Sequence, residues 1–146
     1  MRAVVQRAAE ASGSVDGRSV GRNGPGHVVF VGVGTGDGAS AADPPADKLA
    51  GLRCFEDADS KFNRSVQDVG GAFLVISQFT LYGDARRGRR PSFTEAAAPE
   101  VAAPLVERFV ALLREEGVPE VAQGRFQAHM LVEILNDGPV TIMPER

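Results

Sequence analysis

The sequence has few of the side chains that build disulfide frameworks and metal centres. Of its 146 residues, one is cysteine (Cys54), two are histidine (His27 and His129) and none is tryptophan. A single cysteine excludes an internal disulfide and a multi-cysteine zinc site, and the two histidines do not have metal-ligand spacing. We therefore expect no metal and no cofactor. Hydrophobic residues make up 43% of the chain, which is enough for one domain over residues 1–146 with its own core.

Long apolar runs are also missing. No stretch approaches the roughly 20 apolar residues that cross a bilayer. The first ten residues, MRAVVQRAAE, carry charges at Arg2 and Arg7 and have too short an apolar run for a secretory signal. These absences predict a cytoplasmic protein with no membrane partner.

An overall positive charge is absent, because the net charge is −3. The chain as a whole therefore has no long-range attraction for nucleic acid. Four arginines nevertheless gather in the short segment DARRGRRPSF, namely Arg86, Arg87, Arg89 and Arg90. Such a local cluster is consistent with contacts to phosphates and equally with a solvated loop.

Strand-like segments dominate what is present. Residues 3–8, 27–34 and 72–82 are apolar runs of strand length, and Asp16-Gly17 is a residue pair typical of a tight hairpin turn. Residues 126–134 alternate between apolar and polar side chains. The apolar residues that share one face there are Phe126, Ala128, Met130, Val132 and Ile134.

Two helices interrupt the strands. The first is expected to begin with Asp43 as its N-cap and Pro44 at the first helical position. The second covers roughly residues 99–116, and Pro104 inside it indicates either a later start or a kink. The pattern predicts an α+β fold: a strand-rich, antiparallel or mixed sheet, or a barrel-like core, with two main helices in a single domain.

Standard catalytic arrangements are missing as well. No spacing identifies a nucleophile with its base or a pair of carboxylates for acid–base work. The glycine-rich VGVGTGDG lacks the spacing of a dinucleotide-binding fingerprint, and a loop follows where a helix should begin. Any chemistry must therefore depend on less obvious groups.

Two short segments are unusual. In SQFTL, Ser77–Leu81, polar side chains follow directly on a deeply apolar strand, whose rigid end can present backbone N–H groups to a ligand or can simply be a strand edge. In NDGPVT, Asn136–Thr141, glycine precedes proline, which is the least hindered X-Pro peptide. From the residues alone, Gly138-Pro139 is consistent with a turn between two strand-like runs or with a backbone geometry held for a purpose.

The residues do resemble a known family over essentially the whole chain. The matching segments are MRAVVQRA, FEDADSKFN, GGAFLVISQFTL, RRPSF, GRF and LNDGPVT. They are similar to the D-aminoacyl-tRNA deacylases, whose signatures S-Q-x-T-x and N-x-G-P-V-T both occur intact here. The resemblance implies hydrolysis of the ester of D-aminoacyl-tRNA, and of glycyl-tRNA mischarged on tRNA(Ala), by a homodimer with active sites at the subunit interface. Its partner is the tRNA acceptor end.

The resemblance also implies roles for individual residues. The Gly138-Pro139 bond is expected to be cis, with both carbonyl oxygens directed at the substrate so that L-amino acids are excluded. Backbone N–H groups of Phe79 and Thr80 are expected to stabilise the oxyanion, while Gln78 and the Thr80 side chain position the reacting groups. The remaining expected substrate-binding residues are Ser77, Arg7, Asn136, Gly138, Pro139, Val140 and Thr141, and the expected tRNA-binding residues are Arg86, Arg87, Arg89 and Arg90.

Two alternatives stay open at this point. One is a relative on the same scaffold that hydrolyses L-alanyl esters mischarged onto another tRNA. The other is a non-catalytic module that binds the 3′ end of tRNA, which is compatible with the lack of a recognisable side-chain catalyst.

Overall fold

The structure is a computed structural model that describes residues 1–144. Eight strands, two α-helices and one 3₁₀ helix follow one another along these residues. In chain order they are β1 (Arg2–Val15), β2 (Arg18–Asn23), β3 (Gly26–Gly32), α1 (Asp43–Ala50), β4 (Phe55–Glu56), β5 (Phe62–Arg64), β6 (Ala72–Ser77), the 3₁₀ helix η1 (Phe79–Tyr82), α2 (Pro99–Glu115), β7 (Glu120–Gln123) and β8 (Leu131–Ile142).

Six of the strands form one mixed sheet. Its order is β2-β1-β3-β6-β7, with β8 paired to β1. The pairings of β1 with β2, β3 and β8 are antiparallel, whereas β3–β6 and β6–β7 are parallel. A parallel pair needs a long connection, and these two connections carry α1 and α2.

The sheet curls until it almost closes on itself. At Gly21 on β2, an added Cβ would lie 2.7 Å from the carbonyl oxygen of Gln123 on β7. Glycine therefore allows the two ends of the strand order to approach each other. The expected α+β fold with a mixed, barrel-like sheet and two main helices is confirmed.

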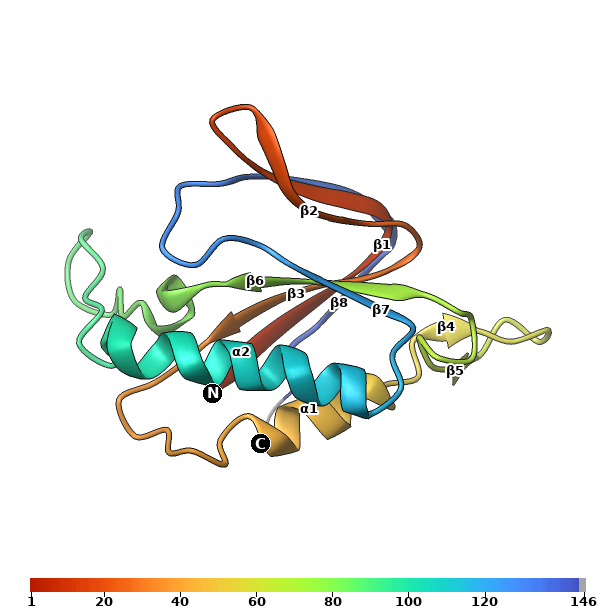
Figure 1. The fold of residues 1–146 in the computed structure, drawn as a ribbon, viewed down its shortest axis with the longest axis horizontal. Helices are drawn as coiled ribbons and strands as arrows, with labels where there is room; N and C mark the ends of the chain where they lie inside the picture. Colours follow the sequence, from red (N-terminus) through yellow and green to blue (C-terminus); the bar gives the residue numbers. More distant parts are fainter. Residues whose placement is uncertain (145–146) are drawn as a thin grey trace.

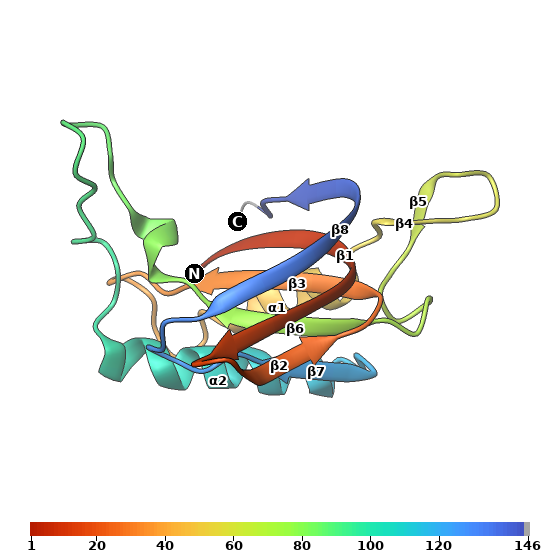
Figure 2. The same ribbon diagram turned by 90° about the horizontal axis from the view of Figure 1, so that it is seen from above.

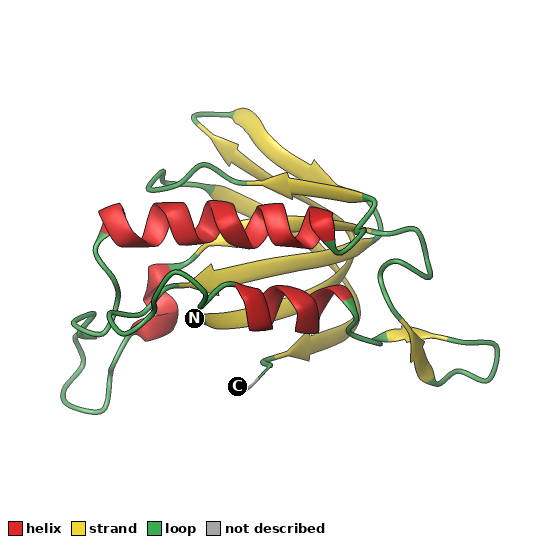
Figure 3. Ribbon diagram, turned by 60° about the horizontal axis from the view of Figure 1, so that its bottom comes forward, coloured by secondary structure: helices red, strands yellow, loops and turns green. Residues whose placement is uncertain are grey.

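Both helices lie on one face of the sheet, as Figures 1 and 3 show. The main core fills the space between them and the strands. Its fully buried members include Leu49 of α1, Phe73 of β6, and Phe109 and Leu113 of α2. None of the helices within residues 1–144 is long and apolar enough to cross a membrane.

Two of the expected element boundaries are wrong. Asp43 is the first residue of α1 and Ala42 is the N-cap; the Asp43 carboxylate instead accepts two hydrogen bonds from Arg108 of α2, at 2.8 and 3.0 Å. The strand expected over residues 72–82 ends at Ser77, and a 3₁₀ turn follows. α2 begins at Pro99 as expected and continues past Pro104.

The C-terminal strand also differs from the prediction. Residues 125–130 are loop and turn, and β8 begins at Leu131. It then continues through Gly138 and Pro139 to Ile142. The Asp16-Gly17 hairpin turn is confirmed, with positive φ at both residues.

Candidate functional site

A cavity of about 560 Å³ opens where β6 ends. Ser77, Gln78 and Phe79 line it on one side. Residues of α2 and of the loop before β8 also line it. The other lining residues are Val31, Gly32, Val33, Ile76, Ala97, Pro99, Ala102, Val106, Phe126, Gln127, Ala128, His129, Met130 and Val132. The lining of a largely apolar cavity thus includes the first residues of the segment SQFTL.

The 3₁₀ helix η1 begins at this cavity, because its first residue, Phe79, lines it. Gln78 closes the strand by donating its backbone N–H to the Val31 carbonyl at 2.8 Å. Phe79 and Thr80 then open η1, so their N–H groups have no acceptor within the helix. The Gln78 side-chain amide donates to the Thr80 hydroxyl. The segment therefore offers two backbone donors beside a side-chain pair of fixed orientation.

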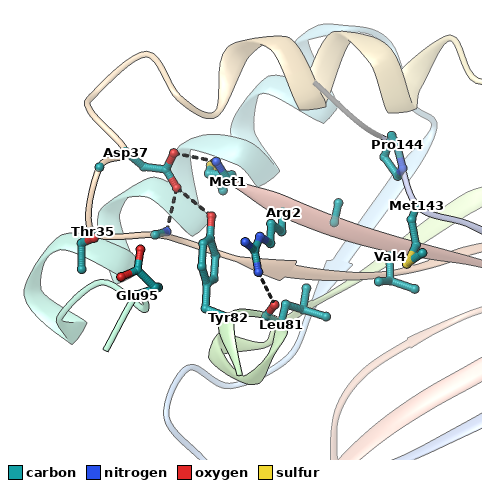
Figure 4. A pocket seen from close by; sticks show the side chains of 13 residues that line it. Met1, Arg2, Val4, Thr35, Asp37, Leu81, Tyr82, Glu95, Met143 and Pro144 are labelled. Atoms are coloured by element: carbon teal, nitrogen blue, oxygen red, sulfur yellow. Dashed lines mark hydrogen bonds and ion pairs between the residues drawn. The ribbon is translucent and has the colours of Figure 1, made fainter. Parts of the chain in front are cut away.

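A second network holds the last two residues of η1, Leu81 and Tyr82 (Figure 4). Arg2 donates to the Leu81 carbonyl at 2.9 Å, and its guanidinium lies 4.3 Å from the centre of the Tyr82 ring. The Tyr82 hydroxyl is 3.3 Å from the Asp37 carboxylate, which also accepts hydrogen bonds from the Met1 ammonium at 2.6 Å and the Gly34 N–H at 2.7 Å. These contacts tie the end of the motif to β1 and to the loop after β3.

The Gly138-Pro139 segment lies on β8 opposite β1. Asn136 pairs with Ala8 and Thr141 with Gln6, so four residues of β8 bulge out where β1 has only Arg7. The Gly138-Pro139 peptide bond is cis, and both residues are exposed.

Arg7 of β1 holds this bulge of β8 in place. It is buried, and it donates to the Asp137 carbonyl at 3.0 Å and to the Cys54 carbonyl at 2.8 Å. Its guanidinium also lies 5.9 Å from the Phe55 ring centre and 5.4 Å from that of Phe62. One rigid donor therefore holds both the Asp137 carbonyl and the Cys54 carbonyl, which directly precedes β4, and it lies beside aromatic rings of both hairpin strands.

Burial favours the neutral forms of two titratable groups near Arg7, His27 and Cys54. Burial, and to a smaller extent the nearby Arg7 charge, together lower the pKa of His27 to about 4. Burial raises the pKa of the Cys54 thiol to about 11, against a smaller opposing effect of Arg7. The thiol sulfur lies 3.5 Å from His27 Nε2. Arg7 thus carries the charge in this buried cluster, where a protonated His27 would repel it.

The two motifs do not meet within one chain. In the sheet register, Ser77 of β6 lies beside Val31 of β3, and Val31 lies beside Ala3 of β1. Arg7 of β1 lies beside His27 of β3, and His27 lies beside Phe73 of β6. The row of residues that contains Ser77 and the row that contains Arg7 are four residues apart along the strands, which corresponds to roughly 13 Å. Gly138 and Pro139 also do not line the cavity.

The loop before β8 is the part of the cavity wall that sequence reasoning missed. It was expected to be strand, yet Phe126, Gln127 and His129 line the cavity from it. The available signal was Gly124, where an added Cβ would lie 2.9 Å from side-chain atoms of both Ile76 and Met130. That glycine marks a close approach of the loop to the end of β6.

Comparison with known proteins identifies the family. A family model described as D-Tyr-tRNA(Tyr) deacylase matches residues 4–145. The chain belongs to this family. It is 60% identical over 145 residues to a D-aminoacyl-tRNA deacylase of Heliobacterium modesticaldum, covering 99% of this chain and 96% of that protein. It is 57% identical over 143 residues to one of Thermotoga petrophila, covering 98% and 95%.

Solved structures agree with this family fold. A structure titled c-Myc DNA Unwinding Element Binding Protein superposes with a TM-score of 0.93 at 36% identity, covering 100% of this chain and 99% of that one. A probable eukaryotic D-amino acid tRNA deacylase superposes with a TM-score of 0.84 at 20% identity, covering 97% of each chain. The second likeness concerns the fold alone.

Proposed function

We propose that this member of the D-Tyr-tRNA(Tyr) deacylase family hydrolyses the ester that joins a D-amino acid to the 3′-terminal adenosine of tRNA. The observation that carries the proposal is the near full-length identity of 60% to a protein named D-aminoacyl-tRNA deacylase. The cavity beside Ser77–Phe79 supports it, because it combines a largely apolar lining with the start of η1, whose first N–H groups have no acceptor within the helix. Glycine has no side chain for the site to exclude, so glycyl-tRNA mischarged on tRNA(Ala) is a second proposed substrate.

The chemistry rests on backbone groups. Water adds to the ester carbonyl, the Phe79 and Thr80 N–H groups stabilise the developing oxyanion, and the bond to the 3′ oxygen breaks as that oxygen takes up a proton. A donor of this kind contributes about 3 kcal/mol to transition-state stabilisation. The Thr80 hydroxyl already accepts a hydrogen bond from Gln78, and within residues 1–144 no histidine or carboxylate is paired with it to activate it as a nucleophile. We therefore assign Gln78 and Thr80 to positioning and the proton transfer to the ribose 2′-hydroxyl of the substrate.

Selectivity for D-amino acids is assigned to the Gly138-Pro139 segment of a second copy of the chain. The segment is exposed, and Arg7 holds the Asp137 carbonyl that precedes it. The segment lies too far from Ser77–Phe79 of the same chain to act there. Fixed carbonyl oxygens would meet the side chain of an L-amino acid and leave space for that of a D-amino acid. Asn136, Val140 and Thr141 would support this segment as its neighbours on β8.

The surface of β8 supports pairing with a second copy. Leu131, Leu135 and Met143 have exposed fractions of 67%, 59% and 71%. The strand is paired to β1 along one edge and has no strand on its other edge among the described residues. A twelve-residue edge strand with two exposed leucines invites pairing or covering by another chain. A homodimer with shared sites at this interface accounts for both features.

Hydrolysis of D-tyrosyl-, L-tyrosyl-, glycyl- and L-alanyl-tRNA by the purified protein tests the proposal. We expect rapid loss of the D-tyrosyl and glycyl esters and survival of the L-tyrosyl ester. Comparable hydrolysis of both tyrosyl esters would contradict the selectivity, and preferential loss of the L-alanyl ester would favour the L-alanyl-editing alternative. Survival of all four would favour a nucleic-acid-binding module, the role that the name of the 36% identical structure carries. The variant Thr80→Ala should retain most of the activity.

A further inference from the structure

The segment between η1 and α2 forms a projecting arm, residues 84–92. Asp84 and Ser92 exchange two backbone hydrogen bonds of 2.8 and 2.9 Å, which close it at its base. Gly88 lies in the middle with a φ of +73°, which suits a turn at the tip. Figure 2 shows this green segment extending away from the body of the molecule.

The base of the arm is fixed at the rim of the cavity. The Phe93 ring, directly after the arm, contacts the Phe79 ring edge-on with 5.1 Å between centres. At Gly83, directly before the arm, an added Cβ would lie 3.0 Å from both the Phe93 ring and the Thr80 carbonyl oxygen. Because Phe79 lines the cavity, a substrate that enters it passes beside the arm.

The four arginines of the arm are not equivalent. Arg86 makes two side-chain hydrogen bonds to the Asp84 carboxylate, at 2.9 and 2.7 Å, and its backbone N–H donates to the same carboxylate at 3.0 Å. These hydrogen bonds hold the pKa of Asp84 well below its usual range. Arg87, Arg89 and Arg90 are exposed and have no ion pair or hydrogen bond within residues 1–144. Three guanidinium groups are thus available to a ligand, and the fourth is occupied.

Charge complementarity indicates a polyanion as the ligand. The arm holds four arginines and one aspartate, a net charge of +3, in a chain whose net charge is −3. The tip of the arm at Gly88 is four residues away from each end of its closed base at Asp84 and Ser92. Exposed guanidinium groups on an arm whose base adjoins the cavity suit the phosphates that precede the ester-bearing nucleoside.

We propose that Arg87, Arg89 and Arg90 bind backbone phosphates of the tRNA acceptor strand, while Arg86 is held by Asp84 and binds none. The choice of tRNA rests on the proposed function. The sequence alone grouped all four arginines together, whereas the structure separates one that shapes the arm from three that bind.

The salt dependence of binding to uncharged tRNA tests this without requiring catalysis. Each phosphate contact contributes about 0.7–0.9 to the slope of log K against log salt concentration. The triple variant Arg87→Gln/Arg89→Gln/Arg90→Gln should therefore lower the slope by about 2. The double variant Asp84→Asn/Arg86→Gln removes the internal pair without changing the net charge and should leave the slope unchanged. Arg18→Gln/Arg22→Gln on β2 is the control for charge loss elsewhere.

Two results would overturn the proposal: an unchanged slope in the triple variant, or a drop in the Asp84/Arg86 double variant equal to one phosphate contact. A second readout separates it from the proposed function. With D-tyrosyl-tRNA the triple variant should lose at least about tenfold in kcat/KM, whereas with D-tyrosyl-adenosine, which has no phosphates, it should match the wild type. Failure of the wild type to hydrolyse either ester would contradict the hydrolase function and leave the binding result to stand by itself.

Discussion

At the scale of single residues, Gly138 is the position where the smallest change should have the largest effect. Its φ is +124°, and an added Cβ would lie 2.8 Å from Val140 Cγ2 and 3.1 Å from Arg7 Nη2. We expect Gly138→Ala to lower the free energy of unfolding by about 1–3 kcal/mol and to lower hydrolysis of D-tyrosyl-tRNA at least about tenfold, since the segment must shift relative to Arg7.

The control for this substitution is Gly24→Ala. Gly24 has no heavy atom within 4 Å of an added Cβ and no positive φ. Urea denaturation and single-turnover hydrolysis should show that variant to be close to the wild type. If Gly138→Ala also behaved like the wild type in both measurements, the assignment of the site to this backbone would be wrong.

His27 gives the protein a predictable dependence on pH. Its folded-state pKa of about 4 lies below the usual 6.5, so the unfolded state binds the proton more readily in the window between these values. Stability is therefore complete above about pH 7 and falls as the pH drops. From pH 7 to pH 4.5 we expect a loss of about 2–3 kcal/mol. Urea denaturation at several pH values measures it, and His27→Leu should flatten the dependence within this window; a flat wild-type profile would contradict it.

At the scale of elements, local sequence patterns predicted which helices and strands exist better than they predicted where each one begins and ends. The second helix, the hairpin at Asp16-Gly17 and the buried strand that opens at His27 follow directly from periodicity and turn residues. The strand after Gly124 was misplaced because alternation of apolar side chains continues into a loop that packs on the core. Asp43 was wrongly predicted to cap the helix because its carboxylate pairs instead with Arg108, 65 residues away. A prediction from neighbouring residues does not include a partner at that distance in the sequence.

α2 offers a test of how far local preferences matter. Pro104 is exposed inside the helix, where it removes the N–H that would donate to the carbonyl four residues earlier. Pro104→Ala restores that donor and should raise the free energy of unfolding by about 1–2 kcal/mol, net of the added freedom of the unfolded chain. Pro99→Ala, at the first helical position where no donor is needed, should change it little. Thermal denaturation of both variants measures the difference, and equal effects would refute the argument.

At the scale of the whole molecule, the two motifs of the candidate site could be recognised in the sequence, but a single folded chain does not bring them together. The motifs at Ser77–Leu81 and Asn136–Thr141 were recognisable in the sequence, and their grouping into one site came from resemblance. The fold places them about four strand residues apart in register, on different strands. Which surfaces of two chains meet depends on shape and exposed apolar area, and neither is encoded in a short motif.

Mixing two inactive variants tests the shared site most directly. Gly138→Ala impairs the segment that one chain would donate, and Ala102→Phe fills the cavity that the other chain would provide, since Ala102 lines it. In a mixed dimer, one site carries both defects and the other carries neither. Co-refolding equal amounts gives half of the molecules as mixed dimers, so activity should return to about a quarter of the wild-type value.

Activity in the wild type, and activity recovered by mixing the variants, should both require the dimer. Sedimentation should give twice the chain mass of 15.4 kDa for the wild type and for each variant, and Leu131→Glu/Leu135→Glu should give monomers without hydrolytic activity, because two charges would enter an apolar interface. Activity that stays at the level of the separate variants after mixing, in samples shown to contain mixed dimers, would mean that each chain builds its site alone. The Gly138-Pro139 segment would then have to act through Arg7 and the β4–β5 hairpin rather than on the substrate of a partner.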